Sequence, residues 1–223
     1  SWIAAFFEGL SQAAADWQVD LIGGDTTRSQ GGVVIAISLL GKATQPRLQN
    51  QAQPGDVLMA YGDFGAAAAG LYCLEQKLQG FEVLKHKQRR PMPLLDAAHQ
   101  LSQALGGQRL ALTDASDGLG RSLQLLCGPN LGCQVDLELV PVLPEVWTLA
   151  QASEQDPWEW IVHGGEDYAL LASLAPEQQS WALNLGWKAL GWVLPCPPLC
   201  LNRTGAEPLI LTSPAGFQHF DAV

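Results

Sequence analysis

A short acidic turn at residues 112–119 constrains the fold of this chain more than any other feature of the sequence. An apolar run leads into the turn, and a pattern with helical periodicity leads out of it. The turn carries Asp114, Ser116 and Asp117, followed at once by Gly118. A strand that passes into a helix through such a turn presents carboxylates, a hydroxyl and free backbone N–H groups at one point. This arrangement favours an architecture in which strands and helices alternate.

Two further turns combine glycine with acidic residues. Gly24 and Asp25 follow a predicted strand at residues 19–22, and Glu166 lies in a turn at residues 163–168. Paired glycines let a backbone approach a phosphate closely, and a carboxylate beside them can reach a cation bound to that phosphate. The alternative is structural, because aspartate and glycine are common in tight turns and aspartate often caps the next element of the chain.

Strands and helices interleave along the whole chain, which predicts an α/β (α+β) fold. Periodicity and propensity predict helices at residues 2–16, 66–78, 94–105, 119–127 and 176–185. The predicted strands lie at residues 19–22, 33–40 (a buried strand), 56–61, 133–139, 168–174, 188–194, 199–202 and 208–211. A polar segment with prolines at residues 43–55 is the best candidate for a domain boundary.

Composition narrows the classes of partner. The net charge is −10 and the pI about 4.7, which argues against binding to a nucleic-acid backbone. Hydrophobic residues make up 48% of the chain, enough for a sizeable core, but no apolar run approaches the length of a membrane-spanning helix. The five cysteines are odd in number and form no CxxC pair, so we expect a reducing, cytoplasmic location.

The central turn has the chemistry of a metal and phosphate site. Asp114, Ser116 and Asp117 supply the hard oxygen ligands that Mg²⁺ prefers. Two carboxylates this close repel each other unless a cation lies between them, which favours a metal. The structural alternative is that Ser116 or Asp117 caps the helix that begins near Gly118.

Five segments occur in the order found in the thiamine-monophosphate kinase family, and the chain resembles that family over nearly its whole length. The segments are residues 21–28, 54–56, 114–119, 164–168 and 216–220, with the Arg90-Pro91 pair between the second and third. The resemblance implies the fold of aminoimidazole-ribonucleotide synthetase-like ATP-binding proteins. Residues 1–50 are then the end of an N-terminal ferredoxin-like domain for ATP binding and dimerisation, and residues 51–223 form a C-terminal α/β domain with a mixed sheet.

The resemblance also implies a reaction. Members of the family transfer the γ-phosphoryl group of ATP to thiamine monophosphate, giving thiamine diphosphate and ADP, with several Mg²⁺ ions in the cleft. By motif, Gly24 and Asp25 bind the ATP phosphates, and Ser116 contacts ATP. Asp25, Asp114 and Asp117 are the expected metal ligands and catalytic residues.

The remaining site residues come from the same resemblance. Glu166 and Phe217 are expected to hold the thiamine group of the substrate. An arginine that the family uses on ATP aligns with Gln49, although Arg47 lies close enough to take that role. A cationic thiazolium ring suits a carboxylate with an aromatic neighbour.

One difference between this chain and the family lowers the kinase activity that we expect. The family carries an N-terminal segment with an Asp-Asp metal motif and a second acidic helix, and these 223 residues contain neither. We therefore expect negligible kinase activity from this polypeptide alone, and a homodimer when the protein is full-length. Two alternatives stay open: a non-catalytic nucleotide- and metal-binding fragment, and another ATP-using enzyme of the same superfamily.

Overall fold

The structure is a computed structural model, and it describes residues 1–211. The chain divides into two compact units, Ser1–Ala43 and the unit that begins at Thr44. The domain roles predicted for residues 1–50 and 51–223 remain predictions.

The first unit contains one helix, α1 (Trp2–Asp16), as the sequence predicts. The Ser1 hydroxyl accepts a hydrogen bond from the Ala4 N–H at its N-terminus. The strands predicted at residues 19–22 and 33–40 do not form. A strand needs a neighbour to take up its backbone hydrogen bonds, and no strand lies within residues 1–43 to serve as one. The β-branched side chains of residues 33–40 are therefore exposed rather than buried.

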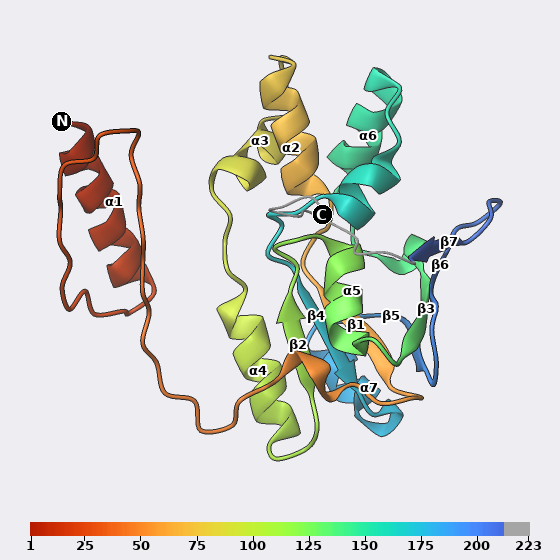
Figure 1. The fold of residues 1–223 in the computed structure, drawn as a ribbon. Coiled ribbons are helices and arrows are strands. Elements are labelled where there is room, and N and C mark those ends of the chain that lie inside the picture. Colours follow the sequence, from red (N-terminus) through yellow and green to blue (C-terminus); the bar gives the residue numbers. More distant parts are fainter. Residues whose placement is uncertain (212–223) are drawn as a thin grey trace. The chain divides into compact units, whose positions relative to one another are not determined.

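The second unit is built on a seven-stranded mixed sheet with the order β2-β4-β1-β5-β3-β6-β7 (Figure 1). Its strands are β1 (Val57–Tyr61), β2 (Ala111–Asp114), β3 (Gly132–Asp136), β4 (Leu170–Leu174), β5 (Lys188–Leu194), β6 (Leu199–Asn202) and β7 (Leu209–Leu211). All neighbours are antiparallel except β3 and β6, which run parallel. The mixed α/β fold predicted from the sequence is confirmed.

Helices pack on both faces of this sheet. The α-helices of the unit are α2 (Ala66–Glu75), α3 (Glu82–Arg89), α4 (Leu95–Leu105), α5 (Leu119–Cys127), α6 (Pro144–Ser153) and α7 (Gln179–Asn184). Short 3₁₀ turns lie at η1 (Gln49–Gln51), η2 (Leu137–Leu139) and η4 (Pro176–Gln178), and a π-helical turn at η3 (Glu159–His163). Helix α5 packs on one face through Leu119, Leu123 and Leu126, all fully buried. Helices α4 and α7 cover the other face together with Trp187.

A separate cluster of helices, α2, α3 and α6, lies beyond one end of the strands (Figure 1). Helices α2 and α3 pack closely because Gly70 has no side chain: a Cβ built there would lie 2.1 Å from the Leu84 carbonyl oxygen. Val146 and Leu149 of α6 complete the apolar contact. Within residues 1–211, no helix is long and apolar enough to cross a membrane.

The strand register brings three turns to one edge of the sheet. Asp114, the last residue of β2, pairs with Leu170 at the start of β4. On its other side Leu170 pairs with Tyr61, the last residue of β1. The turns at residues 62–65, 115–118 and 164–169 therefore leave the sheet side by side. Two of the three acidic turns identified in the sequence meet at this edge.

Candidate functional site

The carboxylates of the central turn are available to a ligand. Among residues 1–211, no hydrogen-bond donor or cation contacts the side chains of Asp114, Ser116 or Asp117. The N-cap of α5 is Gly118, and no side chain caps the helix there. The structural alternative, in which Ser116 or Asp117 caps this helix, is therefore wrong. The side chains that the sequence marks as ligands are not used to hold the fold.

The central turn and the turn at residues 164–169 are held together through their backbones. The Glu166 N–H donates to the Ser116 carbonyl at 2.7 Å, and the Ala115 N–H donates to the Ala169 carbonyl at 2.8 Å. Gly118 has φ +96°, and a Cβ added there would lie 2.6 Å from the Gly164 carbonyl oxygen. Only glycine fits this position, because a side chain would meet both the conformation and the neighbouring backbone.

Glu166 and Tyr168 both adopt left-handed backbone conformations, with φ of 67° and 52°. Such conformations cost free energy in residues other than glycine, so the surrounding contacts must impose them. The Tyr168 hydroxyl donates to the Glu166 carboxylate at 3.3 Å. The turn thus presents Glu166 as an exposed carboxylate with a phenol beside it.

The pKa of the Tyr168 phenol depends on burial and on charges at the same edge of the sheet. Burial raises the pKa of the Tyr168 phenol, and the nearby carboxylates of Glu166, Asp114 and Asp117 raise it further. Asp114 and Asp117 therefore lie close enough to Tyr168 for their negative charge to act on the phenol. A divalent cation is the natural counterion for that charge.

The donor set fits Mg²⁺ bound together with a phosphate. Mg²⁺ is usually held by one or two carboxylates, with water and substrate phosphates completing its ligands. Asp114 and Asp117 supply that number, and their side chains are unpartnered in the described chain. Among residues 1–211, no group of three or more His, Cys, Asp or Glu side chains is placed to hold a metal ion.

Asp167 has a role that the sequence did not indicate. Its carboxylate accepts hydrogen bonds from the N–H groups of Gly65 (2.6 Å) and Ala67 (2.8 Å), at the N-terminus of α2. Burial raises the pKa of this carboxyl to about 7, although the two N–H donors and Lys87 oppose the shift. Asp167 therefore ties the turn that carries Glu166 to α2. No sequence pattern reveals this contact, because the partners are about one hundred residues apart.

Gln49 and Arg47 both lie in the second unit but have different environments. The Gln49 amide donates to the Thr113 hydroxyl at 3.0 Å, one residue before Asp114. The Arg47 guanidinium donates to the carbonyls of Ser102, Gly106 and Gln108, at the end of α4 and just beyond it. Gln49 is thus next to the acidic edge, whereas Arg47 holds the end of a helix.

Three predicted site residues belong either to the first unit or to the part of the chain outside residues 1–211. Gly24 and Asp25 belong to the first unit, where the Asp25 carboxylate accepts a hydrogen bond from the Thr26 N–H at 2.8 Å. No atom lies within 4 Å of a Cβ built at Gly24. Phe217 lies outside the described residues. The roles predicted for these three residues stay predictions.

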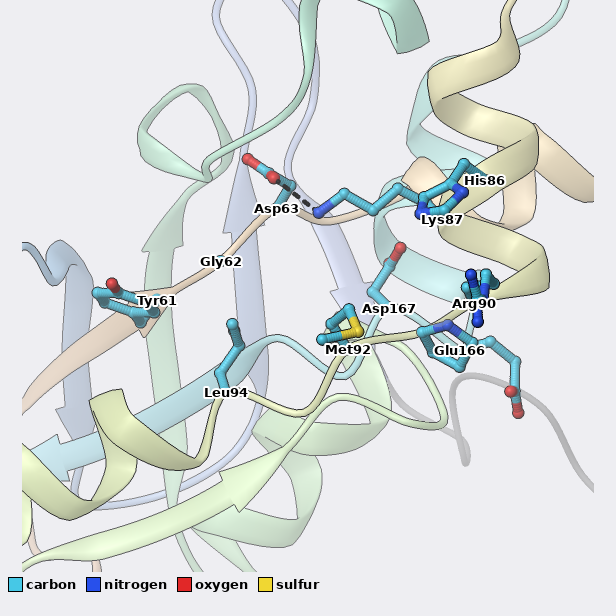
Figure 2. Close-up of a pocket in the computed structure, with 11 residues that line it drawn as sticks. Tyr61, Gly62, Asp63, His86, Lys87, Arg90, Met92, Leu94, Glu166 and Asp167 are labelled. Atoms are coloured by element: carbon cyan, nitrogen blue, oxygen red, sulfur yellow. Dashed lines mark hydrogen bonds and ion pairs between the residues drawn. The ribbon is translucent and has the colours of Figure 1, made fainter. Parts of the chain in front are cut away.

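A pocket of about 320 Å³ opens beside the turn that carries Glu166 (Figure 2). Its lining is mixed in charge and has an apolar part. The residues are Tyr61, Gly62, Asp63, His86, Lys87, Arg90, Pro91, Met92, Leu94, Glu166 and Asp167. The basic segment at residues 85–90 contributes three of these side chains, those of His86, Lys87 and Arg90.

Comparison with known proteins identifies the class of this fold. Residues 1–43 match the family described as AIR synthase related protein, N-terminal domain. The structure is similar to that of AaThiL complexed with AMPPCP and TMP, with a TM-score of 0.74 and 19% sequence identity over 94% of this chain and 68% of that one. The fold is thus that of the AIR synthase-like proteins.

The sequence comparison is more specific. The thiamine-monophosphate kinase of Bacillus subtilis is 30% identical over 99% of this chain and 70% of its own length. The thiamine-monophosphate kinase of Rhodopirellula baltica is 29% identical over 96% of this chain, which spans 63% of that relative. The chain belongs to the thiamine-monophosphate kinase family, and the resemblance seen in its sequence is confirmed.

Proposed function

We propose that this chain carries the catalytic edge of an enzyme that phosphorylates thiamine monophosphate with ATP to give thiamine diphosphate. The observation that carries the proposal is the meeting of two acidic turns at one edge of the sheet. There, Asp114, Ser116 and Asp117 have side chains without partners among residues 1–211. The AaThiL structure holds an ATP analogue and TMP, which supports both substrates.

In this proposal, some residues of the edge bind ATP and its Mg²⁺, and others bind the acceptor. Asp114 and Asp117, with Asp25 of the first unit, would hold Mg²⁺. The metal would supply neutralisation of the charge on the transferring phosphoryl group. Ser116 and Gly24 contact the ATP phosphates in this proposal, and Gln49 lies where it could join them.

The acceptor needs little chemical activation. A phosphate monoester has its second pKa near about 6, so it is already a nucleophile at neutral pH. Direct transfer without a covalent intermediate is therefore sufficient, and catalysis rests on positioning and on charge neutralisation. Glu166 faces the cationic thiamine group in this proposal, with Phe217 stacked on it.

The setting of the enzyme is a further part of the proposal. All five cysteines are free thiols in the structure, which favours a reducing, cytoplasmic location. Exposed apolar side chains in the first unit, such as Ile22 and Val34, favour burial against a second copy in a full-length homodimer. Net charge −10 continues to argue against nucleic acid as a partner.

A second function is supported by one specific observation. Within residues 1–211, the edge offers the carboxylates of Asp114 and Asp117, the number that usually holds Mg²⁺ together with a nucleotide phosphate. A protein with only this edge could bind Mg²⁺ and nucleotide without completing the transfer. Nucleotide binding without product would favour this alternative.

The test is formation of thiamine diphosphate from γ-labelled ATP and thiamine monophosphate, detected by chromatography. In the full-length protein, transfer that requires both Mg²⁺ and the acceptor, and that falls at least about 100-fold in Asp117→Asn, is the expected result. Asp136→Asn is the control, because Asp136 caps η2 by accepting the Glu138 N–H. If labelled phosphate were released to water at the same rate with and without thiamine monophosphate, the protein would hydrolyse ATP rather than transfer its phosphoryl group, which would contradict the proposal.

A further inference from the structure

The pocket beside Glu166 contains one strong cation that no other group in the described chain neutralises. Arg90 ends α3, and its backbone N–H donates to the His86 carbonyl at 2.9 Å. Among residues 1–211, its guanidinium has neither a carboxylate partner nor a hydrogen-bond acceptor. The side chain is exposed and lines the pocket (Figure 2).

Most of the other charged groups in the pocket are already engaged. Lys87 pairs with Asp63 at 3.3 Å across the pocket wall, drawn as a dashed line in Figure 2. Asp167 is occupied by two backbone N–H groups at the N-terminus of α2. Arg90 has no such partner, and Glu166, which lines the same pocket, is an exposed carboxylate that accepts only the Tyr168 hydroxyl among the described residues. A ligand with both a negative and a positive group would match them.

The rest of the lining suits a ring. Tyr61, Met92 and Leu94 give the pocket an apolar part. Gly62 packs closely against Leu94 in this part of the pocket: it has φ +93°, and a Cβ there would lie 2.6 Å from the Leu94 Cδ1. A volume of about 320 Å³ is at the lower end of the range for small-molecule sites, enough for a small heterocycle.

We propose that this pocket is the recognition site for the acceptor, and that Arg90 contacts its phosphate group. The inference rests on the proposed function and deepens it, because it names the residue that selects a phosphorylated acceptor over an unphosphorylated one. A guanidinium binds phosphate oxygens through two parallel N–H donors, which combines charge with geometry. The apolar part holds the heterocycle, and Glu166 faces its cationic group.

The experiment is calorimetric titration of thiamine monophosphate and of thiamine, each into the wild-type chain with Mg²⁺ and AMPPCP. The same titrations are made with Arg90→Gln and with Arg89→Gln. Arg89 is the matched control, because it is also an exposed arginine of the last turn of α3 but does not line the pocket. Arg90→Lys, which keeps the charge and loses the planar fork, is the conservative variant.

The expected result separates the two ligands. Arg90→Gln should weaken binding of thiamine monophosphate by about 10- to 100-fold and change the affinity for thiamine by less than about twofold. Arg89→Gln should leave both affinities unchanged, and Arg90→Lys should lie between wild type and Arg90→Gln. Thermal unfolding of each variant verifies that the fold is intact.

Two outcomes overturn the inference in different ways. If Arg90→Gln weakens both ligands equally, or neither, Arg90 does not contact the phosphate, while the proposed function stands. If the wild-type chain binds neither ligand, the proposed function fails and the inference fails with it.

Discussion

Two of the acidic glycine turns look alike in the sequence but differ in how the structure holds them. In the turn at residues 114–118, Gly118 needs its left-handed φ, and the backbone of Gly164 lies within 2.6 Å of where a Cβ would be. In the turn that carries Asp25, Gly23 and Gly24 have no atom within 4 Å of such a Cβ.

The difference separates two uses of glycine. At Gly118, the absence of a side chain lets two turns approach until their backbones form hydrogen bonds, so the ligands are pre-positioned before any substrate arrives. At Gly24, the same residue type lies in open space within its unit, and no close approach requires a glycine there. A glycine-acid motif therefore marks chemistry, but packing decides whether the site is already formed.

The first prediction concerns filling the closely packed turn. Gly118→Ala should destabilise the chain by about 3 kcal/mol, since it combines an unfavourable backbone conformation with a clash against backbone atoms. Gly24→Ala, in the open turn, should change stability by less than about 0.5 kcal/mol. Urea unfolding monitored by circular dichroism measures both. Equal stability of the two variants would remove the distinction between the turns.

A second prediction concerns Asp167, which anchors the formed edge to α2. Its pKa is raised from 3.8 to about 7, so the folded chain binds this proton more tightly than the unfolded chain does. This group's contribution to stability therefore falls as pH rises from about 4 through about 7, by at most ~1.4 kcal/mol per pH unit. Asp167→Asn should remove that slope from the stability profile.

The control for this experiment is Asp136→Asn, which alters a carboxylate that accepts one N–H at η2. Unfolding free energies are measured between pH 4 and pH 8 for the wild type and both variants. If Asp167→Asn and Asp136→Asn keep the same slope as the wild type, Asp167 does not titrate as burial predicts.

The smallest effect is expected at Tyr168, whose pKa senses the unpartnered carboxylates. Burial comes first in raising this pKa, and Glu166, Asp114 and Asp117 add to it. A cation bound between Asp114 and Asp117 should therefore lower the Tyr168 pKa, by about a few tenths of a unit. Absorbance titration with and without Mg²⁺, corrected by Tyr168→Phe, measures the shift. An unchanged pKa would mean that Mg²⁺ does not bind at these carboxylates.

Much of the second unit could be predicted from the sequence, because its signals are local. Helical periodicity at residues 119–127 and the strand at residues 199–202 agree with α5 and β6. The strand predicted at residues 33–40 failed, although its composition is as favourable as that of β1. β1 has β4 and β5 on either side, whereas residues 33–40 have no neighbouring strand within their unit.

The candidate site was predictable in its chemistry but not in its assembly. Asp114 and Asp117 carried a visible pattern, and the structure leaves both side chains free within the described chain. The contact of Asp167 with the N-terminus of α2 was not predictable, because hydrogen bonds between segments about one hundred residues apart depend on tertiary packing. Arg90 was visible as half of an arginine-proline pair, but its position in a pocket depends on how α3 packs.

The most direct measurement is a titration of Mg²⁺-AMPPCP into the chain, comparing Asp117→Asn with Asp136→Asn. If the formed edge is the metal and phosphate site, wild-type binding requires Mg²⁺, and Asp117→Asn weakens it at least about tenfold while Asp136→Asn does not. If AMPPCP still binds after a chelator has removed Mg²⁺, or binds Asp117→Asn as tightly as the wild type, the metal and phosphate site does not lie at this edge.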